Sequence, residues 1–343
     1  MTYKAIIGDV SRQQWEQYAA GFADYSIYQT WPYQQLRSEL AGQKISRAII
    51  KNENGDVVTM CQVRIKCIRP LGLRIGYVQW GPLVRAKDGT LRCSAEALRT
   101  LWRAYVGSRV NVLRVVPCVC ADEQGKQFTE MLTSSGFERI RAVSPYRTLM
   151  LRIDGGEEAI RKKLHKSFRR DLKKAQKQGI EIRQGHDSRF CQILEHLYLA
   201  SQKRKGFKGL DPQEFIRPQL MLSAAEKMNI IVAYCDGEPV AAHLASSLGD
   251  TAIVLLVANS EKGLYSGSSY LVWWQGAVEA WRAGMKMYDQ GGIDPGNNPA
   301  VYQFKSKMGG AEQIYIGAYE VCSGSVVKGM WRSCEKLYRL AKK

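Results

Sequence analysis

The chain has 343 residues, which is more than one hydrophobic core usually organises, so we expect two domains of about 150 to 180 residues each. It carries 50 Lys and Arg against 32 Asp and Glu, and the formal net charge of +18 favours a polyanionic partner such as nucleic acid, a pyrophosphate or an anionic membrane. A signal-peptide pattern and a run of ~20 apolar residues are both lacking, which argues against a membrane span and predicts a cytoplasmic protein, at most peripheral to the membrane.

The first half of the chain predicts helices and strands that follow one another closely. Apolar spacing, caps and turn residues define these elements. They are a helix capped by Ser11 or Asp9, a helix from Tyr28 to Leu40, a hairpin of 48–51 and 57–61, a strand at 75–80 ended by Gly81-Pro82, a helix at 94–106, a strand at 110–116 and a helix at 128–134 that ends at Gly136.

The second half repeats this plan. It predicts a hairpin of 230–234 and 239–242, a strand at 251–257, a long helix at 270–283 and a strand at 285–288. Hairpin, strand, helix and strand thus occur twice, which indicates a duplicated unit. We therefore predict the α/β class, with mixed sheets that carry helices on their faces.

Three further segments are predicted to be basic or amphipathic. Residues 161–178 hold nine Lys or Arg and a single acid, Asp171, while apolar residues recur at helical spacing, at Ile160, Leu164, Phe168, Leu172 and Ala175. This pattern predicts a single basic amphipathic helix. Its charged face is either simply exposed to solvent or binds the phosphates of RNA or of lipid headgroups. A second cluster, 203–208, mixes basic residues with Phe207, as nucleotide sites do. The tail from Val326 to Lys343 predicts a helix that must dock through an apolar stripe of Val327, Met330, Trp331, Cys334, Leu337 and Tyr338.

The segment from Met285 to Val321 holds the strongest candidate for a site. Paired glycines at Gly291-Gly292 allow a turn or a close approach to a ligand. A short helix should then begin at the cap Asn298 and end at Gly309-Gly310. In it Val301, Phe304 and Met308 share a face, with Lys305 at the border of that face on the side of Tyr302. Lys305 either lies in a cleft, or packs its stem on the core while its ammonium reaches water.

Several reaction classes lack their motifs. The four histidines, at 165, 186, 196 and 243, form no HExxH, and GxSxG, paired-carboxylate and P-loop motifs are also absent. The nine cysteines are isolated, so we expect reduced, mostly buried thiols and no metal centre. For acyl-CoA chemistry, 263–269 would have to hold a pyrophosphate, yet it lacks the usual glycine-rich pattern. A coenzyme A site at 263–269 would therefore depart from the usual sequence pattern of such sites.

Asp289-x-Gly291-Gly292, followed by Val301-Tyr302-x-Phe304-Lys305-x-x-Met308-Gly309-Gly310 and a strand, resembles the C-terminal signature of the Fem-type peptidyl transferases. The resemblance extends along most of the chain. It covers Gln29-Thr30-Trp31-Pro32-Tyr33 with Arg37, the strand end from Tyr77 to Pro82, Arg169 with Leu172-Lys173-Lys174-Ala175, and the segment from Ser201 to Phe207. These enzymes have two GNAT-like domains and move an amino acid from aminoacyl-tRNA onto peptidoglycan precursors. One position departs from the family pattern. Val116 stands before the proline where the family often has an acidic residue, so no general base is available there.

The resemblance implies two tandem GNAT-like domains. Residues 1–150 with 320–343 form the first, to which the tail helix returns, and 151–319 form the second. It implies an aminoacyl-tRNA donor, no cofactor, and a UDP-linked or lipid-linked peptidoglycan precursor as acceptor. The rivals are an acyl-CoA-dependent N-acyltransferase and a basic RNA- or lipid-binding protein without chemistry.

The resemblance also assigns site residues. Lys305 and Phe304 would be catalytic, with Lys305 as a fixed cation beside the oxyanion of the reaction. Arg37 and Arg204 would contact precursor phosphates. The remaining predicted substrate-binding residues are Tyr33, Tyr302, Asp289, Gly291 and Gly292, and the predicted tRNA-binding residues are Arg169, Lys173 and Lys174.

Overall fold

The computed structural model describes residues 2–206 and 209–340 and divides into two compact units. Unit 1 comprises Met1–Tyr146 and Ile314–Lys343, and unit 2 comprises Arg147–Gln313. These boundaries lie a few residues from the expected 1–150 with 320–343 and 151–319. Phe207 and Lys208 of the second basic cluster, and the last three residues of the tail, lie outside the described residues.

Unit 1 is built on a seven-stranded sheet. β4 and β5 pair in parallel, and the other neighbouring strands named here pair antiparallel. The strands, in spatial order, are β1 (Lys4–Ile7), β2 (Lys44–Lys51), β3 (Val57–Ile68), β4 (Leu73–Gln79), β5 (Val112–Val116), β14 (Ala318–Cys322) and β6 (Glu138–Ile140). The helices are α1 (Arg12–Ala19), α2 (Trp31–Leu40), α3 (Ala95–Tyr105), α4 (Glu123–Ser135) and α12 (Ser325–Leu340), with short 3-10 turns at Ile27–Gln29 and Arg69–Leu71.

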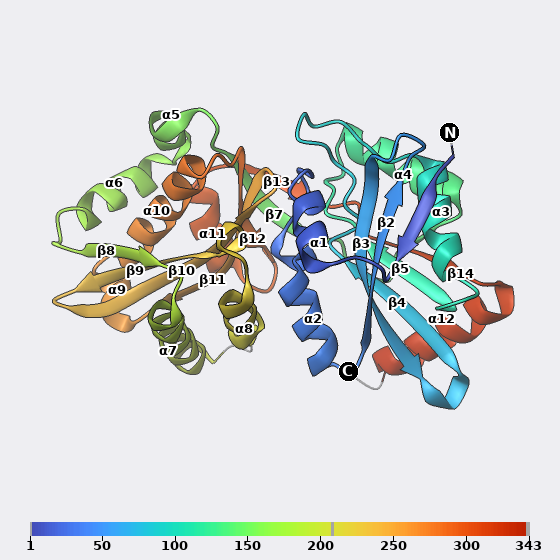
Figure 1. The fold of residues 1–343 in the computed structure, drawn as a ribbon. Helices are drawn as coiled ribbons and strands as arrows, with labels where there is room; N and C mark the ends of the chain where they lie inside the picture. The colour runs from blue at the N-terminus through green and yellow to red at the C-terminus, as the bar shows by residue number, and fades with distance from the viewer. Residues whose placement is uncertain (1, 207–208, 341–343) are drawn as a thin grey trace. The chain divides into compact units, whose positions relative to one another are not determined.

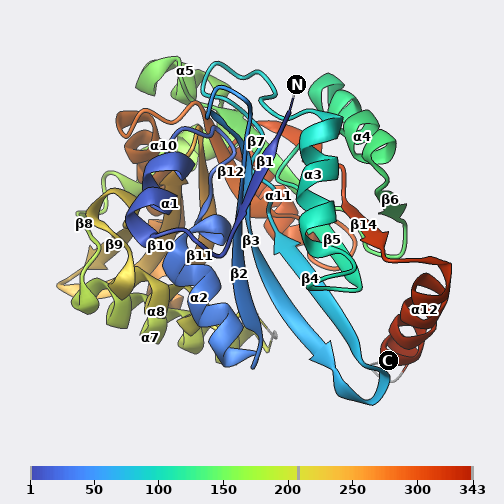
Figure 2. The same cartoon turned by 45° about the vertical axis from the view of Figure 1, so that its right-hand side comes forward.

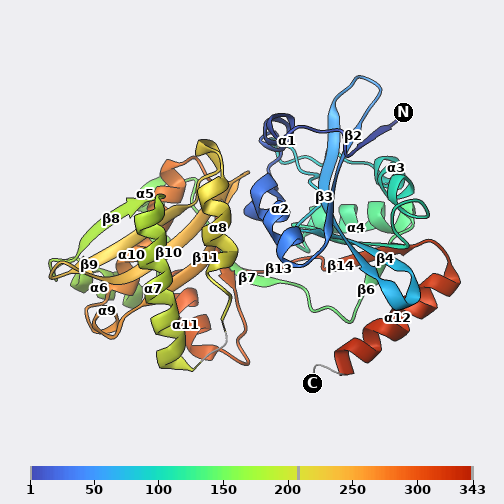
Figure 3. The ribbon, with the colours of Figure 1, turned by 60° about the horizontal axis from the view of Figure 1, so that its bottom comes forward.

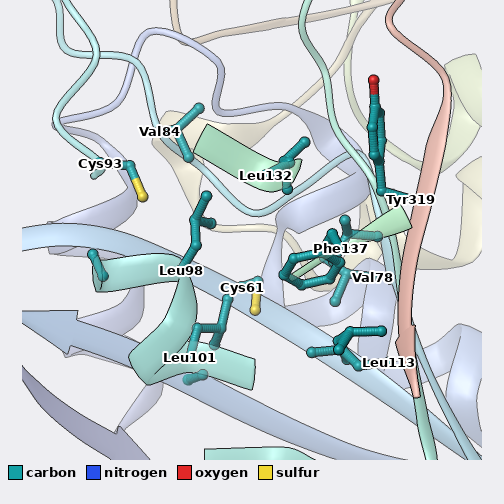
Figure 4. Close-up of a cluster of buried hydrophobic side chains, with 14 of the residues drawn as sticks. Cys61, Val78, Val84, Cys93, Leu98, Leu101, Leu113, Leu132, Phe137 and Tyr319 are labelled. Carbon is teal, nitrogen blue, oxygen red and sulfur yellow. The ribbon is translucent and has the colours of Figure 1, made fainter. Parts of the chain in front are cut away.

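The core of unit 1 lies between the sheet and the pair α3 and α4. Figure 4 shows Leu98 and Leu101 of α3, Leu132 of α4 and Leu113 of β5 directed toward one another. Val112 and Leu113 are neighbours in β5, so their side chains point to opposite faces. Val112 packs with α12 instead, which therefore covers the face that α3 and α4 leave open (Figure 2).

Unit 2 repeats the arrangement with a second seven-stranded sheet, in which β11 and β12 form the parallel pair. Its strands, in spatial order, are β13 (Ala311–Ile314), β7 (Arg147–Arg152), β12 (Met287–Gly292), β11 (Thr251–Asn259), β10 (Glu238–Leu248), β9 (Asn229–Cys235) and β8 (Glu181–Gly185). Its helices are α5 (Gly156–Lys163), α6 (Lys166–Ala175), α7 (Ser188–Lys205), α8 (Gln213–Met221), α9 (Glu261–Tyr265), α10 (Ser268–Arg282) and α11 (Pro299–Lys307), with a 3-10 turn at Ala224–Glu226. Helices α5, α6 and α10 lie on one face of this sheet and α7 and α8 on the other (Figures 1 and 3).

The predicted class and repeat are confirmed, because each half contains the expected hairpin, strand, helix and parallel strand within a mixed sheet. Local signals account for the agreement. Ser11 caps α1 with a reciprocal capping box, and Gly136 ends α4 in the left-handed conformation. Asp236 and Gly237 both take positive φ in the β9–β10 turn, as a two-residue hairpin requires.

The single basic helix predicted at 161–178 is wrong, because the chain breaks between α5 and α6. Leu164 is extended (φ −64°, ψ 139°), and His165 caps α6 through its side chain. The His165 N–H donates to the carbonyl of Lys307, 2.9 Å away, and so leaves the helical hydrogen-bond ladder. The apolar face still holds, since Ile160, Leu164, Phe168, Leu172 and Ala175 are all buried.

Three smaller expectations are also corrected. The strand predicted at 285–288 is β12, which continues through Gly291-Gly292 rather than turning there. On α12, Met330 and Leu337 are exposed, while Val327 and Trp331 dock; the side chain of Tyr338 lies outside the described residues. The cysteines of the described chain form no disulfide, but only Cys61, Cys93 and Cys191 are buried.

None of the helices in residues 2–206 and 209–340 combines the length and apolar character needed to cross a membrane.

Candidate functional site

Helix α11 places Lys305, and its ends are fixed as the sequence predicts. The side chain of Asn298 accepts a hydrogen bond from the backbone N–H of Val301, and Pro299 occupies the first turn. Gly309 and Gly310 follow with φ of +91° and +97°. A Cβ on Gly309 would lie 2.5 Å from the carbonyl oxygen of Lys163, and one on Gly310 would lie 2.7 Å from that of Met150. Only glycines therefore fit where the helix ends against its neighbours.

The face that α11 turns inward differs from the predicted one. Val301 is exposed, Met308 is fully buried, and Lys305 is only 7 % exposed. Lys305 thus lies within the buried face and not at its border. The alternative in which the Lys305 ammonium reaches water is wrong, because its Nζ ends inside the unit.

Backbone carbonyls of β12 hold the Lys305 ammonium. Nζ donates to the carbonyl oxygens of Gly291 (3.0 Å) and Gly292 (2.9 Å) and lies 5.8 Å from the centre of the Trp273 ring. Burial lowers the pKa of Lys305 to about 8, and the nearby carboxylate of Asp289 acts in the opposite direction. An ammonium has three N–H donors, so in the described part of the chain one donor is left for a further acceptor.

Asp289 orders the strand end that supplies those carbonyls. Its carboxylate accepts a hydrogen bond from the backbone N–H of Gly291 (2.8 Å) and one from the hydroxyl of Thr148 on β7. The Thr148 hydroxyl also contacts the Gly291 carbonyl at 3.1 Å. The register between β12 and β7 shifts between Asp289 and Gly292, which marks a bulge. Asp289 is fully buried, so its position suits orienting Gly291 and balancing the charge of Lys305.

The ladder between the two parallel strands ends close to Lys305. Thr251, Ala252 and Ile253 of β11 pair with Met287, Tyr288 and Asp289 of β12, and the ladder ends there. Gly291, with φ +76°, approaches β11 so closely that a Cβ would lie 2.8 Å from the Val254 carbonyl oxygen. The ladder ends toward the carboxyl ends of the two parallel strands, the side at which α/β sheets commonly bind ligands.

An aromatic cluster joins α11 to the basic helix α6. The Phe304 ring lies 5.3 Å from Tyr270, 5.7 Å from Phe168 and 5.8 Å from Trp273, measured between ring centres. Phe304 therefore packs with its neighbours on α6 and α10. The residue after Phe168 begins the exposed cationic face of α6, which carries the predicted tRNA-binding residues Arg169, Lys173 and Lys174.

Arg204 is placed near the start of α10. It is exposed at the end of α7, and its guanidinium donates to the backbone carbonyl of Asn259 at 2.7 Å. The side chain of Asn259 accepts in turn from Ser269, in the first turn of α10. In the neighbouring 263–269 segment, a Cβ on Gly263 would lie 2.1 Å from the Val240 carbonyl oxygen, so α9 packs tightly there.

The structure brings together Lys305, Phe304, Asp289, Gly291 and Gly292 around the end of β12. Tyr302 is half-buried on the same helix. Tyr33 and Arg37 lie on α2 of unit 1. Tyr33 is fully buried, with its ring centre 5.3 Å from that of Tyr28, and Arg37 is half-buried.

Two residues of the site are absent from the sequence prediction. Thr148 and Trp273 lie far from α11 in the chain, and neither belongs to a motif, so no sequence signal connected them with Lys305. His243 is a buried histidine on β10. Its Nε2 lies 2.7 Å from the hydroxyl of Tyr288, and burial lowers its pKa to about 3. No group of His, Cys, Asp or Glu within 2–206 and 209–340 is arranged to hold a metal ion.

Comparison with known proteins identifies the class of fold. Residues 162–306, which include β9 to β12 and most of α11, match the model of an acetyltransferase (GNAT) domain. None of the curated proteins matches the sequence. The crystal structure of FemX matches this chain with a TM-score of 0.81 and 15 % sequence identity, and the match covers 99 % of this chain and 100 % of the FemX chain. The chain thus has the tandem GNAT-like fold of Fem type.

Two other solved structures share this fold more distantly. The C-terminal domain of an Agrobacterium fabrum protein described as a lysylphosphatidylglycerol synthetase gives a TM-score of 0.53 at 10 % identity, over 94 % of each chain. A tandem GNAT protein from the clavulanic acid biosynthesis pathway gives 0.50 at 10 % identity, over 94 % of this chain and 99 % of its own. At such identities the likeness concerns the fold alone.

Proposed function

We propose that this chain transfers an aminoacyl group from aminoacyl-tRNA to the stem-peptide amine of a peptidoglycan precursor, at the Lys305 site of unit 2. The observation that carries the proposal is a desolvated cation held just beyond the end of the ladder between two parallel strands. The motif resemblance to the Fem-type transferases and the fold shared with FemX support the choice of donor and acceptor.

The reaction is aminolysis of an ester. The acceptor nitrogen attacks the aminoacyl carbonyl carbon, and the carbonyl oxygen gains negative charge. The C–O bond to the tRNA terminal ribose then breaks, and that oxygen leaves with a proton while the nitrogen loses one. The remaining N–H of Lys305 would donate to the developing oxyanion. Fixed donors of this kind act strongly because they are already oriented in a water-poor site.

The charged surfaces of unit 2 fit a polyanionic donor. Arg169, Lys173 and Lys174 are exposed on α6, which packs against α11 through Phe168 and Phe304. Arg204 stands beside the first turn of α10, where helix N–H groups favour phosphate oxygens. We assign the α6 face to the tRNA backbone and Arg204 to precursor phosphates.

An acyl-CoA-dependent N-acyltransferase is the second candidate, and one observation favours it. The match to an acetyltransferase (GNAT) domain spans the strands and helices around Lys305. The same cation could serve an acyl thioester, with thiolate as the leaving group. Against this, Gly263 is packed on Val240, so 263–269 is not an open phosphate loop at that point.

The deciding experiment offers a UDP-linked muramyl pentapeptide as acceptor, with labelled aminoacyl-tRNAs or labelled acetyl-CoA in parallel. We expect label to pass from tRNA, and the transfer to be lost in Lys305→Ala but kept in Lys307→Ala, an exposed lysine on the same helix. Transfer only from acetyl-CoA would replace the first proposal by the second. Binding of RNA without transfer from either donor would contradict both.

A further inference from the structure

Helix α12 has one face fixed on the sheet of unit 1. Val327 and Trp331 pack with Leu73, Ile75 and Val112. Beneath the helix, Arg114 of β5 binds the carboxylates of Glu320 (2.7 Å) and Glu335 (2.8 Å). The indole N–H of Trp331 also donates to Glu320, at 3.1 Å. These contacts set which side of α12 faces outward.

The outward side carries a row of apolar side chains. Val326 is 75 % exposed, Met330 39 %, Leu337 67 % and Leu340 62 %. The spacings of four, seven and three residues keep them on one stripe of the helix. Leu71, at the tip of the β3–β4 hairpin, is exposed as well, and this tip lies beside α12 in Figures 2 and 3. Exposed apolar rows of this kind commonly mark a surface that another body covers.

Cations border the row. Glu335 is the one acid between Ser325 and Leu340, and it is turned inward to Arg114. Lys328 and Arg332 reach Glu138 on β6, while Lys336 is exposed. Between α12 and β6 lies a hollow of about 500 Å³. Its lining includes Arg139, Arg141, Arg332 and Lys336, and its two carboxylates, Glu320 and Glu335, are the ones already bound to Arg114.

We propose that α12 is a membrane-surface helix that lies flat on an anionic bilayer. Val326, Met330, Leu337 and Leu340 would enter the boundary between headgroups and acyl chains, and Lys336, Arg139 and Arg141 would lie against lipid phosphates. An apolar stripe on a convex helix, bordered by cations and free of outward acids, fits a lipid surface better than a protein groove. The net charge of +18 adds long-range attraction to the same surface. The proposal does not depend on Lys305 or on the transferred group.

Flotation of the full chain with vesicles tests the proposal. We expect binding to vesicles that contain phosphatidylglycerol and little binding to pure phosphatidylcholine. The triple variant Val326→Gln, Leu337→Gln, Leu340→Gln should bind more than about tenfold more weakly. Its matched control replaces the exposed Leu40, Leu199 and Leu220 by Gln on other helices, and should bind as the wild type does. Circular dichroism and thermal melts establish that both variants are folded.

A charge series gives a second, independent readout. Replacing Lys336 by Gln and Arg141 by Gln should each weaken vesicle binding about fivefold, whereas Lys126→Gln, an exposed lysine on α4, should not. In addition, Leu337→Trp should show a blue shift of its fluorescence when anionic vesicles are added. Binding of the folded triple variant at wild-type strength would overturn the proposal. So would a loss of tRNA binding, with vesicle binding intact, in the same variant.

Discussion

Each unit contains a corresponding pair of parallel strands, and the two pairs differ in how their ladders end. In unit 1, β4 and β5 remain paired from Ile75 with Val112 to Gln79 with Val116, and the N–H of Gly81 then donates to Val116 at 3.1 Å. Beyond them, the Trp80 ring packs against Tyr28, Tyr146 and Tyr315. In unit 2 the ladder between β11 and β12 ends after three residue pairs. Backbone bonds and aromatic rings cover the end of the first ladder, whereas a cation lies at the end of the second.

The comparison separates what the repeated fold supplies from what the site needs. Both units place a strand, a helix and a parallel strand alike, so this topology alone does not create the Lys305 environment. Where β12 leaves β11, the carbonyls of Gly291 and Gly292 lose strand partners, and buried carbonyls need another donor. Lys305 donates to both, and the Thr148 hydroxyl also donates to the Gly291 carbonyl. The environment of Lys305 therefore follows from the end of the ladder, which the predictions below are designed to disturb.

The largest effect is expected from removing the cation. Lys305→Met should lower the transfer rate by about 10²- to 10³-fold, equivalent to ~2.7 to 4 kcal/mol, because the oxyanion loses a fixed donor. Single-turnover transfer from aminoacyl-tRNA measures this loss. Lys307→Met, on the exposed side of the same helix, should stay close to the wild-type rate. A folded Lys305→Met that keeps the wild-type rate would show that the interrupted pair is not the reaction site.

The next effect is a dependence of stability on pH. Lys305 holds its proton to about pH 8 in the folded chain, against an ordinary pKa of 10.5. Between these values the unfolded chain binds more protons, so the free energy of unfolding should rise with pH across this window and stay level below it. The full change is about 3 kcal/mol. It is measured as the difference in urea unfolding free energy between wild type and Lys305→Met, at several pH values from 7 to 10.

The transfer rate should run opposite to stability. It should fall as the pH rises through about 8, since the cation is then lost. Asp289→Asn should move this fall to lower pH, because the carboxylate raises the pKa of Lys305. If the difference in unfolding free energy between wild type and Lys305→Met does not change with pH, Lys305 is not held as a buried ammonium.

A smaller effect should come from crowding the close approach of β12 to β11 at Gly291. Gly291→Ala must keep φ near +76° and places a Cβ 2.8 Å from the Val254 carbonyl oxygen. We expect it to lower the unfolding free energy by about 1 to 3 kcal/mol. Gly237→Ala is the matched control, since Gly237 has φ +77° but open space around a Cβ. The difference between the two variants isolates the crowding at Val254, and equal losses would argue that the strands do not approach so closely.

Local signals allowed the ends of α11 to be predicted, because Asn298 and Gly309-Gly310 act through bonds and φ angles within a few residues. The direction of Lys305 was misjudged for a different reason. Helical spacing predicts the buried face of a helix from the positions of its apolar residues. Lys305 is buried for another reason, because its ammonium donates to backbone carbonyls of β12 that are distant in sequence.

The same limit explains the break between α5 and α6. Leu164 and Phe168 keep perfect helical spacing across it, and no Gly or Pro marks it. The bond from His165 to the Lys307 carbonyl decides the break, and such tertiary competition leaves no trace in a local pattern. The bulge at Gly291 is similar: two glycines indicated a turn or a close approach to a ligand, and only pairing with β7 shows that they continue a strand.

The smallest predicted effect distinguishes binding from catalysis within unit 2. Arg204 is exposed and is oriented by one bond to the Asn259 carbonyl, so Arg204→Ala should change the unfolding free energy by less than about 0.5 kcal/mol. If its guanidinium binds a substrate phosphate, KM for the phosphate-bearing acceptor should rise about tenfold with kcat nearly unchanged, since that contact is equal in ground state and transition state. Arg204→Lys should recover part of the loss, because a lysine keeps the charge without the forked geometry. Lys203→Ala, which removes an exposed charge next to it, controls for net charge. A fall in kcat for Arg204→Ala, or an equal rise in KM for Lys203→Ala, would remove Arg204 from the phosphate site.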